Sequence, residues 1–351
     1  MIFGKKDRLV GLDIGSKTIK AAELVENKKG VCLFKFGMTD IAPGLIEEGT
    51  IKDPEAVADA IRQLFKSYSI KNHNVAISVG GYSVIVKKIS IPAASEEQLQ
   101  DTIQFEAEQY IPFDINDVNL DFQIMGENEN NPNQMNVLLV AAKQDMVNEY
   151  VNLAQMAGLE PKVIDVDAFA LQNIFELNYV VENENVALID IGASKTSLNI
   201  LKGQESVFMR DVSLGCGQIN QKIAATTDCS LEEAESIKFG DVAGRMSPEE
   251  LSEIISSVVA DWCTEIRRAL DFFYSTYPDD QIRKIILSGG GGNIKEFRQL
   301  LAVETSAEVD SINPFQNIVI DEHKFDTAYL EKIAPQASIC MGLATRKVDD
   351  K

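Results

Sequence analysis

Residues 9–20 read LVGLDIGSKTIK, and residues 187–200 read ALIDIGASKTSLNI. Each stretch is an apolar run, then Asp-Ile-Gly, then small hydroxyl residues, then a second β-prone run. An apolar strand that turns at glycine and enters another strand predicts a β-hairpin. The aspartates of the two copies, Asp13 and Asp190, lie about half the chain apart. The repeat therefore predicts two related halves, each carrying the same hairpin.

The turns of these two hairpins have the composition of a phosphate-binding site. Gly15 and Gly192 allow the backbone to approach a ligand closely. Exposed backbone N–H groups, with hydroxyl and lysine side chains nearby, can hold a phosphate oxygen. Two such hairpins that face each other would grip a phosphate chain from both sides. The candidate phosphate residues are Ser16, Lys17 and Thr18 in the first turn and Ala193, Ser194, Lys195 and Thr196 in the second.

A third segment fits the same scheme. Residues 284–294 read KIILSGGGGNI, which predicts a buried strand, a turn of four glycines and the start of a helix. A run of glycines lets a flat ring lie against bare backbone. A single Asp-x-Gly turn is common in ordinary proteins, but two at this spacing followed by a strand, a glycine run and a helix indicate a nucleotide site.

The order DIGS…K, then DIGAS, then SGGGGN resembles the actin-like ATPase superfamily over nearly the whole chain. Finer features resemble the PilM family of type IV pilus assembly proteins. They are the opening MIFGKKDRLVGLDIGSKTIKAAEL and the later stretches VIDVDAFALQN (163–173), AESIKFG (234–240), INPFQNI (312–318) and APQASICMGLATR (334–346). FtsA, a cell-division relative, is the alternative. It usually ends in an amphipathic membrane-targeting helix, whereas this chain stops at Lys351 soon after Arg346, which favours PilM.

The resemblance implies an α/β, two-lobed actin-like ATPase fold with a small inserted α/β subdomain in the first lobe. The expected first lobe comprises residues 1–83 with 163–183 and 334–351. The inserted subdomain would be 84–162, and the second lobe 184–333, including a helical subdomain at 223–275.

Local patterns predict several elements. Helices are expected from Asp53-Pro54 to Tyr68, over 95–110, over 145–157 and over 248–275, the last with a core-facing stripe that includes the one tryptophan of the sequence. Residues 119–125 alternate as in a half-buried strand, and the polar stretch 126–136 is expected to be a loop.

The resemblance also assigns roles to the site residues. Asp13 and Asp190 would organise Mg²⁺ through bound water, because Mg²⁺ dehydrates reluctantly. The alternative is that each aspartate only stabilises its turn. Lys20 matches the lysine that follows the first turn in the superfamily and would offer a charge to the phosphates. The nucleoside side of ATP would meet Glu235, Lys238, Gly289, Gly290, Gly291 and Asn293. For Glu235 and Lys238, an ordinary ion pair on a helix surface is the competing interpretation.

Hydrolysis requires a group that positions the attacking water. The acidic candidates at the expected crossing between the lobes are Asp165 and Asp167, which could instead cap the following helix. The second turn has Ala193-Ser194 where many relatives carry an acidic residue or Gly-Gly, so we expect at most a slow ATPase.

Composition excludes several classes of protein. The net charge of −21 disfavours nonspecific binding to nucleic acid or to an anionic membrane. No apolar run is long enough to span a bilayer, and Asp13 interrupts the first one, so no secretory signal is apparent. The five cysteines show no CxxC pairing and are expected to be reduced. With only His73 and His323, a zinc site or a Ser–His–Asp triad is not expected.

The resemblance implies a scaffold at the cytoplasmic side of the inner membrane. Its expected partners are the N-terminal peptide of PilN and other platform and motor components of the pilus machine. The membrane would be reached only through these partners, and a homo-oligomer is possible. Besides the FtsA-like filament, the remaining rival is a sugar or acetate kinase of the same superfamily, although no sugar-site signature is present.

Overall fold

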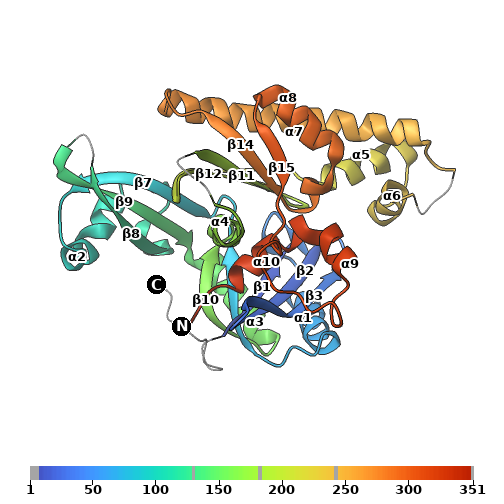
Figure 1. Ribbon diagram of the computed structural model, residues 1–351, viewed down its shortest axis with the longest axis horizontal. Coiled ribbons are helices and arrows are strands. Elements are labelled where there is room, and N and C mark those ends of the chain that lie inside the picture. The colour runs from blue at the N-terminus through green and yellow to red at the C-terminus, as the bar shows by residue number, and fades with distance from the viewer. Residues whose placement is uncertain (1–7, 129–130, 181–183, 241–243, 349–351) are drawn as a thin grey trace.

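The computed structural model describes residues 8–128, 131–180, 184–240 and 244–348. Within these ranges the chain forms two lobes, each built on a five-stranded sheet, with a three-stranded sheet at one side (Figure 1). The first sheet has the order β10-β6-β1-β2-β3. Its strands are β1 (Val10–Ile14), β2 (Thr18–Asn27), β3 (Gly30–Asp40), β6 (Asn74–Val79) and β10 (Glu160–Val166). The short pair β4 (Ile46–Glu47) and β5 (Thr50–Ile51) lies in the same lobe.

The second sheet repeats the topology of the first. Its order is β13-β12-β11-β14-β15, with an antiparallel trio at one side and two parallel strands at the other. In register, Asp13 lies opposite Lys20 in the first lobe and Asp190 lies opposite Ser197 in the second. The strands are β11 (Asn185–Ile191), β12 (Thr196–Lys202), β13 (Glu205–Val212), β14 (Ile282–Ser288) and β15 (Glu308–Ser311). The duplication predicted from the sequence is thus a duplication of structure.

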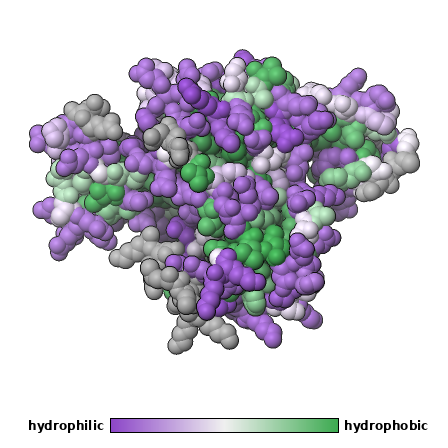
Figure 2. All heavy atoms as spheres, in the orientation of Figure 1, coloured by the Kyte–Doolittle hydropathy of each residue, from purple (hydrophilic) through white to green (hydrophobic). Residues whose placement is uncertain are grey.

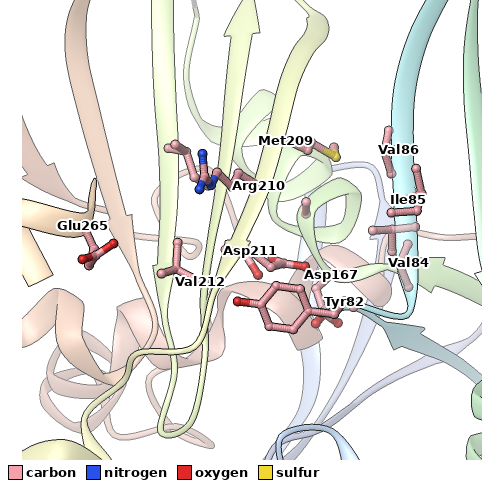
Figure 3. A pocket seen from close by; sticks show the side chains of 16 residues that line it. Tyr82, Val84, Ile85, Val86, Asp167, Met209, Arg210, Asp211, Val212 and Glu265 are labelled. Atoms are coloured by element: carbon pink, nitrogen blue, oxygen red, sulfur yellow. The ribbon is translucent and has the colours of Figure 1, made fainter. Parts of the chain in front are cut away.

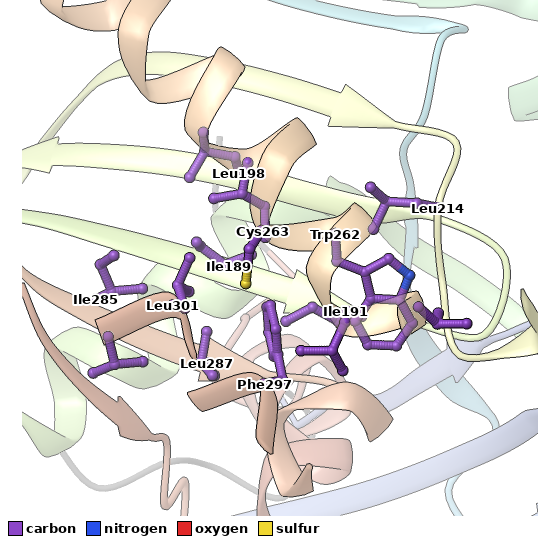
Figure 4. Packing of buried hydrophobic residues seen from close by; sticks show 14 of the residues in the cluster. Ile189, Ile191, Leu198, Leu214, Trp262, Cys263, Ile285, Leu287, Phe297 and Leu301 are labelled. Atoms are coloured by element: carbon purple, nitrogen blue, oxygen red, sulfur yellow. The ribbon is translucent and has the colours of Figure 1, made fainter. Parts of the chain in front are cut away.

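Helices cover one face of the second sheet and close its core. They are α5 (Gly217–Thr227), α6 (Leu231–Lys238), α7 (Pro248–Thr276) and α8 (Lys295–Thr305). Trp262 of α7 is fully buried against the edge of the Phe297 ring and near Ile191 (Figure 4). Its indole N–H donates to the Gln218 side chain at 2.7 Å, so the buried donor is satisfied. The predicted core stripe of this helix is confirmed.

The helix starts follow the sequence signals. Asp53 accepts the backbone N–H of Ala56 at the start of α1 (Pro54–Ser67). Ser95, Ser230 and Ser247 each form a capping box at the starts of α2 (Glu96–Ala107), α6 and α7. These local hydrogen bonds explain why the predicted helix boundaries agree closely with the structure.

Two helices lie between the lobes, in the middle of Figure 1. They are α4 (Asp167–Asn178) and α10 (Ser338–Leu343), and α9 (Thr327–Ile333) precedes α10. Side chains of α4 and α10 share one buried cluster with apolar residues of both sheets. The two helices approach so closely that a Cβ at Gly342 would collide with the carbonyl oxygen of Ala170. The lobes are therefore joined by a packed layer and not only by a connecting strand.

The inserted subdomain is a three-stranded sheet with one long helix. Its strands β7 (Val84–Pro92), β8 (Val118–Asn128) and β9 (Asn131–Lys143) have the order β7-β9-β8, and α2 packs on one face through Leu99 and Ile103. The predicted loop at 126–136 is largely wrong, because the described residues of that stretch extend the β8–β9 hairpin. Most described side chains of this stretch are polar and exposed or half-buried, where backbone pairing needs no apolar face, whereas Met135 is buried in the core of the subdomain.

Helix α3 (Gln144–Met156) packs mainly with the first lobe and not with the core of the inserted sheet. Its buried residues Val147, Tyr150 and Leu153 share a core with α1 and the first sheet, and β10 completes that sheet. Packing therefore favours 84–143 as the inserted unit in place of 84–162. Sequence periodicity shows that α3 has an apolar face, but not which sheet that face meets.

Hydrophilic residues cover most of the face seen in Figure 2, and hydrophobic ones reach it over the inserted subdomain and near the middle of the molecule. Among the described residues, no helix combines the length and apolarity that crossing a bilayer requires.

Candidate functional site

A cavity of about 770 Å³ lies between the lobes where the two repeated hairpins meet. It collects most of the site residues predicted from the sequence. Those that line it are Asp13, Gly15, Ser16, Lys17, Thr18, Lys20, Asp167, Asp190, Gly192, Ala193, Ser194, Lys195, Glu235, Lys238, Gly289, Gly290 and Asn293. Three predicted residues, Asp165, Thr196 and Gly291, are not part of its lining.

The two hairpin turns face each other across the cavity. Each is closed by a backbone hydrogen bond, from Gly15 N–H to the Thr18 carbonyl at 3.1 Å and from Gly192 N–H to the Lys195 carbonyl at 2.9 Å. The hydroxyls of Ser16 and Ser194 are 3.0 Å apart although the residues are 178 positions apart in sequence. The structure thus brings together the two turns that the sequence could only show to be similar.

The two aspartates of the hairpins have different surroundings. Asp13 accepts a hydrogen bond from Lys20 Nζ at 2.9 Å, and both side chains are nearly buried. Burial lowers the pKa of Lys20, but the charge of Asp13 outweighs it, so the pKa is raised and the lysine stays charged. Burial raises the pKa of Asp190 to about 6, an effect opposed by the Ser288 hydroxyl and reinforced by the charge of Asp13. Of the two aspartates, Asp190 is therefore the one whose negative charge is not balanced by a paired cation among the described residues.

An uncompensated carboxylate beside a candidate phosphate-binding turn has the chemistry to hold a Mg²⁺ ion. Within the described residues, no group of three or more His, Cys, Asp or Glu side chains is arranged to hold a metal. Mg²⁺ commonly uses one or two carboxylates, and substrate phosphates and water supply its other ligands. Asp13 and Asp190 provide such a pair, so the residues fit Mg²⁺ only in company with a phosphate ligand.

Asp167, at the start of α4, is held by the second lobe. Its carboxylate receives Lys195 Nζ at 2.5 Å and the Ser78 hydroxyl at 2.6 Å. Burial raises the pKa of Asp167, but the charge and hydrogen bond of Lys195, helped by Ser78, outweigh it and lower that pKa. The ion pair fixes Asp167 as a carboxylate beside the two hairpin turns.

Asp165 serves a different purpose. The residue is 4% exposed, and its carboxylate pairs with Arg346 Nε at 2.7 Å and accepts the N–H of Val166 at 2.8 Å. These contacts tie the end of β10 to the C-terminal segment, outside the cavity. Of the two aspartates predicted to position the attacking water, only Asp167 lines the cavity and remains a candidate. The capping alternative is also wrong, because the N-cap of α4 is Val166 and no side chain caps it.

The end of the cavity at which a nucleoside was predicted to bind is formed in part by α6. Glu235 pairs with Lys17 of the first lobe at 2.6 Å and lies 3.8 Å from Lys238 Nζ. Lys238 donates to the Asn220 side chain, and burial lowers its pKa, opposed by Glu235. The pair is therefore part of a network that crosses between the lobes and not an isolated surface ion pair.

One residue at this end escaped the sequence analysis. Phe239 lines the cavity with 69% of its surface exposed, and Lys238 Nζ lies 5.0 Å from its ring centre. An exposed aromatic ring beside a cavity can stack on a planar base. In the sequence, the position of Phe239 directly after Lys238 is the signal that could have identified it.

Thr196 and Gly291 support the cavity from behind. The Thr196 hydroxyl is fully buried and donates to the Leu214 carbonyl at 3.0 Å. Gly291 packs on the side chain of Ile191, where a Cβ would come within 2.5 Å of the Ile191 Cγ2 atom. Thr196 thus supports the second turn, and Gly291 supports the glycine segment. These structural roles explain why both residues belong to the sequence motifs although neither lines the cavity.

A second cavity, of about 450 Å³, lies between the inserted subdomain and the second lobe; we call it the β7–β13 groove (Figure 3). Its walls are β7 and β13, each an edge strand of its sheet. Lys88 of β7 pairs with Glu205 of β13 at 3.2 Å, and the hydroxyls of Tyr82 and Ser213 are 3.4 Å apart. In Figure 3, Tyr82, Asp211 and Asp167 meet between the two strands.

Comparison with known proteins identifies relatives of this architecture. Residues 11–348 match the sequence family described as type IV pilus assembly protein PilM. A solved PilM-PilN type IV pilus biogenesis complex contains a chain with 27% identity and a TM-score of 0.86, covering 98% of this chain and 99% of that one.

More distant structures share the fold alone. The ethanolamine utilization protein EutJ from Carboxydothermus hydrogenoformans has 12% identity and a TM-score of 0.59, with 98% of this chain and 91% of that one covered. MreB 5 of Spiroplasma citri bound to AMPPNP has 13% identity and a TM-score of 0.51, with coverages of 97% and 95%. The α/β, two-lobed actin-like ATPase fold implied by the sequence is confirmed.

Proposed function

This chain belongs to the PilM family of type IV pilus assembly proteins, and on that premise we propose that it is an ATP-binding scaffold that holds the N-terminal peptide of PilN. A role in type IV pilus assembly follows from the family. The nucleotide, the metal and the peptide are the finer parts of the proposal, and each has its own support.

The observation that carries ATP binding is the meeting of the two repeated turns across one cavity. Ser16 and Ser194 are in contact, so a phosphate chain that enters between the turns would be gripped by both lobes. Lys17 and Lys195 flank this point from the two hairpins and would balance the phosphate charge. When bound, Mg²⁺ would sit at Asp13 and Asp190 and neutralise phosphate charge.

The remaining parts of the cavity suit a nucleoside. The glycine segment at 289–290 presents bare backbone, and Glu235 and Lys238 offer hydrogen-bond partners to a ribose or a base. Phe239 provides a ring on which a base can stack. Asp167 is the residue available to orient water, and the second turn carries Ala193-Ser194 in place of an acidic residue, which favours slow hydrolysis.

The test of this part is thermal unfolding with and without ATP and Mg²⁺. At a ligand concentration a hundredfold above the dissociation constant, the folded state should gain about 2.7 kcal/mol. An unfolding temperature that saturating ATP–Mg²⁺ leaves unchanged would refute nucleotide binding.

For the peptide, the β7–β13 groove has suitable chemistry. A PilN partner is supported by the likeness to the PilM-PilN complex. Two edge strands can pair with an extended peptide through backbone hydrogen bonds, while alternate side chains enter the groove. Val84, Val86 and Met209 supply apolar contacts. The charged residues of the lining are the acidic Asp167, Asp211 and Glu265 and the basic Arg210, a net negative set that favours a peptide carrying Lys or Arg.

The partner site is tested by calorimetric titration of the PilN N-terminal peptide. Deleting 84–162 would remove α3 from the first-lobe core, so a point variant is the cleaner probe. Val86→Glu, in the groove, should weaken binding at least tenfold. Phe105→Glu is the matched control, because Phe105 belongs to the same subdomain, is 71% exposed and does not line the groove. Equal weakening by both variants, or by neither, would place the peptide elsewhere.

The location follows from the partner. We propose that the protein lies at the cytoplasmic face of the inner membrane, peripherally and through PilN and other platform and motor components. The net charge of −21 opposes direct contact with anionic lipid. Self-association would add further contacts, which sedimentation with and without ATP would detect.

A further inference from the structure

The nucleotide cavity and the β7–β13 groove share a wall. Asp167 and Gly80 line both. Most other residues of the two linings come from different elements, with the hairpin turns on one side and strands β7 and β13 on the other. At Asp167 a ligand in one cavity and a ligand in the other would meet the same carboxylate.

At the boundary between the two cavities lies the ion pair of Asp167 and Lys195. Lys195 Nζ reaches Asp167 Oδ2 from the nucleotide side, and the Asp167 side chain is only 16% exposed. The pair packs directly on the backbone of Gly80, where a Cβ would collide with both the carboxylate and the ammonium group. Gly80 therefore leaves room for the pair.

The charged and polar groups around the Asp167–Lys195 pair determine which cation can pair with Asp167 in place of Lys195. On the groove side lie Asp211, whose charge helps to raise the pKa of Lys195 against the effect of burial, and Tyr82 (Figure 3). On the nucleotide side Ser78 donates to Asp167, and Lys20 acts on Asp167 only at a distance. Among these described groups, Lys195 is the one cation in contact with Asp167.

We propose that Lys195 is a charge switch, so that nucleotide phosphate and Asp167 compete for it and nucleotide binding strengthens the binding of a cationic peptide in the β7–β13 groove. The inference rests on the proposed function. When the phosphates draw Lys195 toward the hairpin turns, Asp167 becomes a largely buried carboxylate without a cation. Such a group is costly. A Lys or Arg side chain, or an amino terminus, of a peptide in the groove restores the pairing.

The sign and the size of the coupling follow from this exchange. The cation of the peptide contributes more binding free energy when phosphate holds Lys195, because Asp167 then needs a new partner. Nucleotide and peptide therefore bind with positive cooperativity. Linkage requires that the peptide raise nucleotide affinity by the same factor. Couplings between sites are commonly 5- to 150-fold, and for one exchanged ion pair we expect about tenfold.

The experiment is a calorimetric cycle on the full chain. The PilN N-terminal peptide is titrated with and without saturating AMPPNP–Mg²⁺, and AMPPNP–Mg²⁺ is titrated with and without peptide. A peptide series in which each Lys or Arg is replaced by norleucine, and the amino terminus is acetylated, runs alongside. Nucleotide should tighten the parent peptide about tenfold and leave unchanged the one member that has lost the cation facing Asp167.

Variants of the protein separate the switch from its surroundings. Asp167→Asn and Lys195→Gln should each reduce the coupling factor to one, the former by removing the shared anion and the latter by removing the exchangeable cation. Glu265→Gln is the matched control, since Glu265 lines the groove but not the nucleotide cavity. It should weaken the peptide equally in both nucleotide states and keep the coupling.

The outcomes are distinct. If both ligands bind to the parent protein with a coupling factor of one, or if the coupling survives in every member of the peptide series, the switch is refuted while the proposed function stands. If nucleotide or peptide fails to bind at all, the proposed function is refuted, and the switch with it.

Discussion

Asp190→Asn should make the protein more stable while removing its metal-dependent response to ATP. The pKa of Asp190 is raised from 3.8 to about 6, first because the carboxyl is buried. Two pKa units correspond to about 3 kcal/mol at roughly 1.4 kcal/mol per unit. Since the carboxylate borders an open cavity, we expect about 1.5 kcal/mol, half of that value, to appear as stability.

The pH dependence gives the sign. In the folded protein the carboxyl of Asp190 stays protonated up to about pH 6, whereas in the unfolded chain it ionises above its ordinary pKa of 3.8. Below about pH 4, Asp190 is protonated in both states and does not affect the free energy of unfolding. Between about pH 4 and pH 6 it lowers that free energy by an increasing amount, and above pH 6 the loss is constant. The uncharged amide of the Asp190→Asn variant avoids the penalty, so the advantage of the variant should appear over this window and persist at pH 7.5.

The assay is thermal unfolding of both proteins at pH 4 and pH 7.5, each with and without ATP–Mg²⁺. For 351 residues, 1.5 kcal/mol corresponds to a rise of about 2 °C. We expect that rise at pH 7.5 without ligand, no difference at pH 4, and a smaller ATP–Mg²⁺ shift in the variant. A variant less stable than the parent at pH 7.5, or an advantage equal at both pH values, would refute the assignment of Asp190 as an uncompensated metal carboxylate.

Three further predictions use other parts of the site. Asp13→Ala should also abolish the Mg²⁺ response, but it should destabilise the fold by about 3 kcal/mol in chemical denaturation, because it leaves the buried Lys20 without its partner; unchanged stability would contradict the pairing. ATP turnover, followed by phosphate release, should stay below about 1 s⁻¹ because the second turn carries Ala193-Ser194 in place of an acidic residue, and a faster purified monomer would overturn this. Gly342→Val should prevent α10 from packing on Ala170 and lower the soluble yield and the unfolding temperature, whereas a normal melting curve would contradict the close crossing.

The site was predictable to the extent that its signals are local. The turns around Ser16 and Ser194, the glycine segment and the helix that carries Glu235 each have a composition that reports their own conformation. The structure places nearly all of these residues on one cavity. What the sequence could not supply is the contact between them, because Ser16 and Ser194 meet only when the lobes close on the layer formed by α4 and α10.

Asp165 and Asp167 show why the rest was not predictable. In a continuous strand, residues two apart share a face, so both would point to the same site. The strand ends at Val166 and α4 begins at Asp167, which turns the two carboxylates to different partners. Asp165 meets Arg346, and Asp167 meets Lys195. Both partners are distant in sequence, so no local pattern reveals them.

The sequence by itself determined the duplication, the hairpin turns, the helix caps and the buried stripe of α7, because each depends on hydrogen bonds or periodicity within a few residues. Tertiary structure alone decided that α3 packs with the first lobe, that Asp190 lacks the cation which Asp13 has in Lys20, and that two cavities share Asp167 and Gly80. These features depend on which faces meet when the lobes pack, and on the burial of charge that results. Packing and desolvation are properties of the assembled fold, and no single segment of the chain carries them.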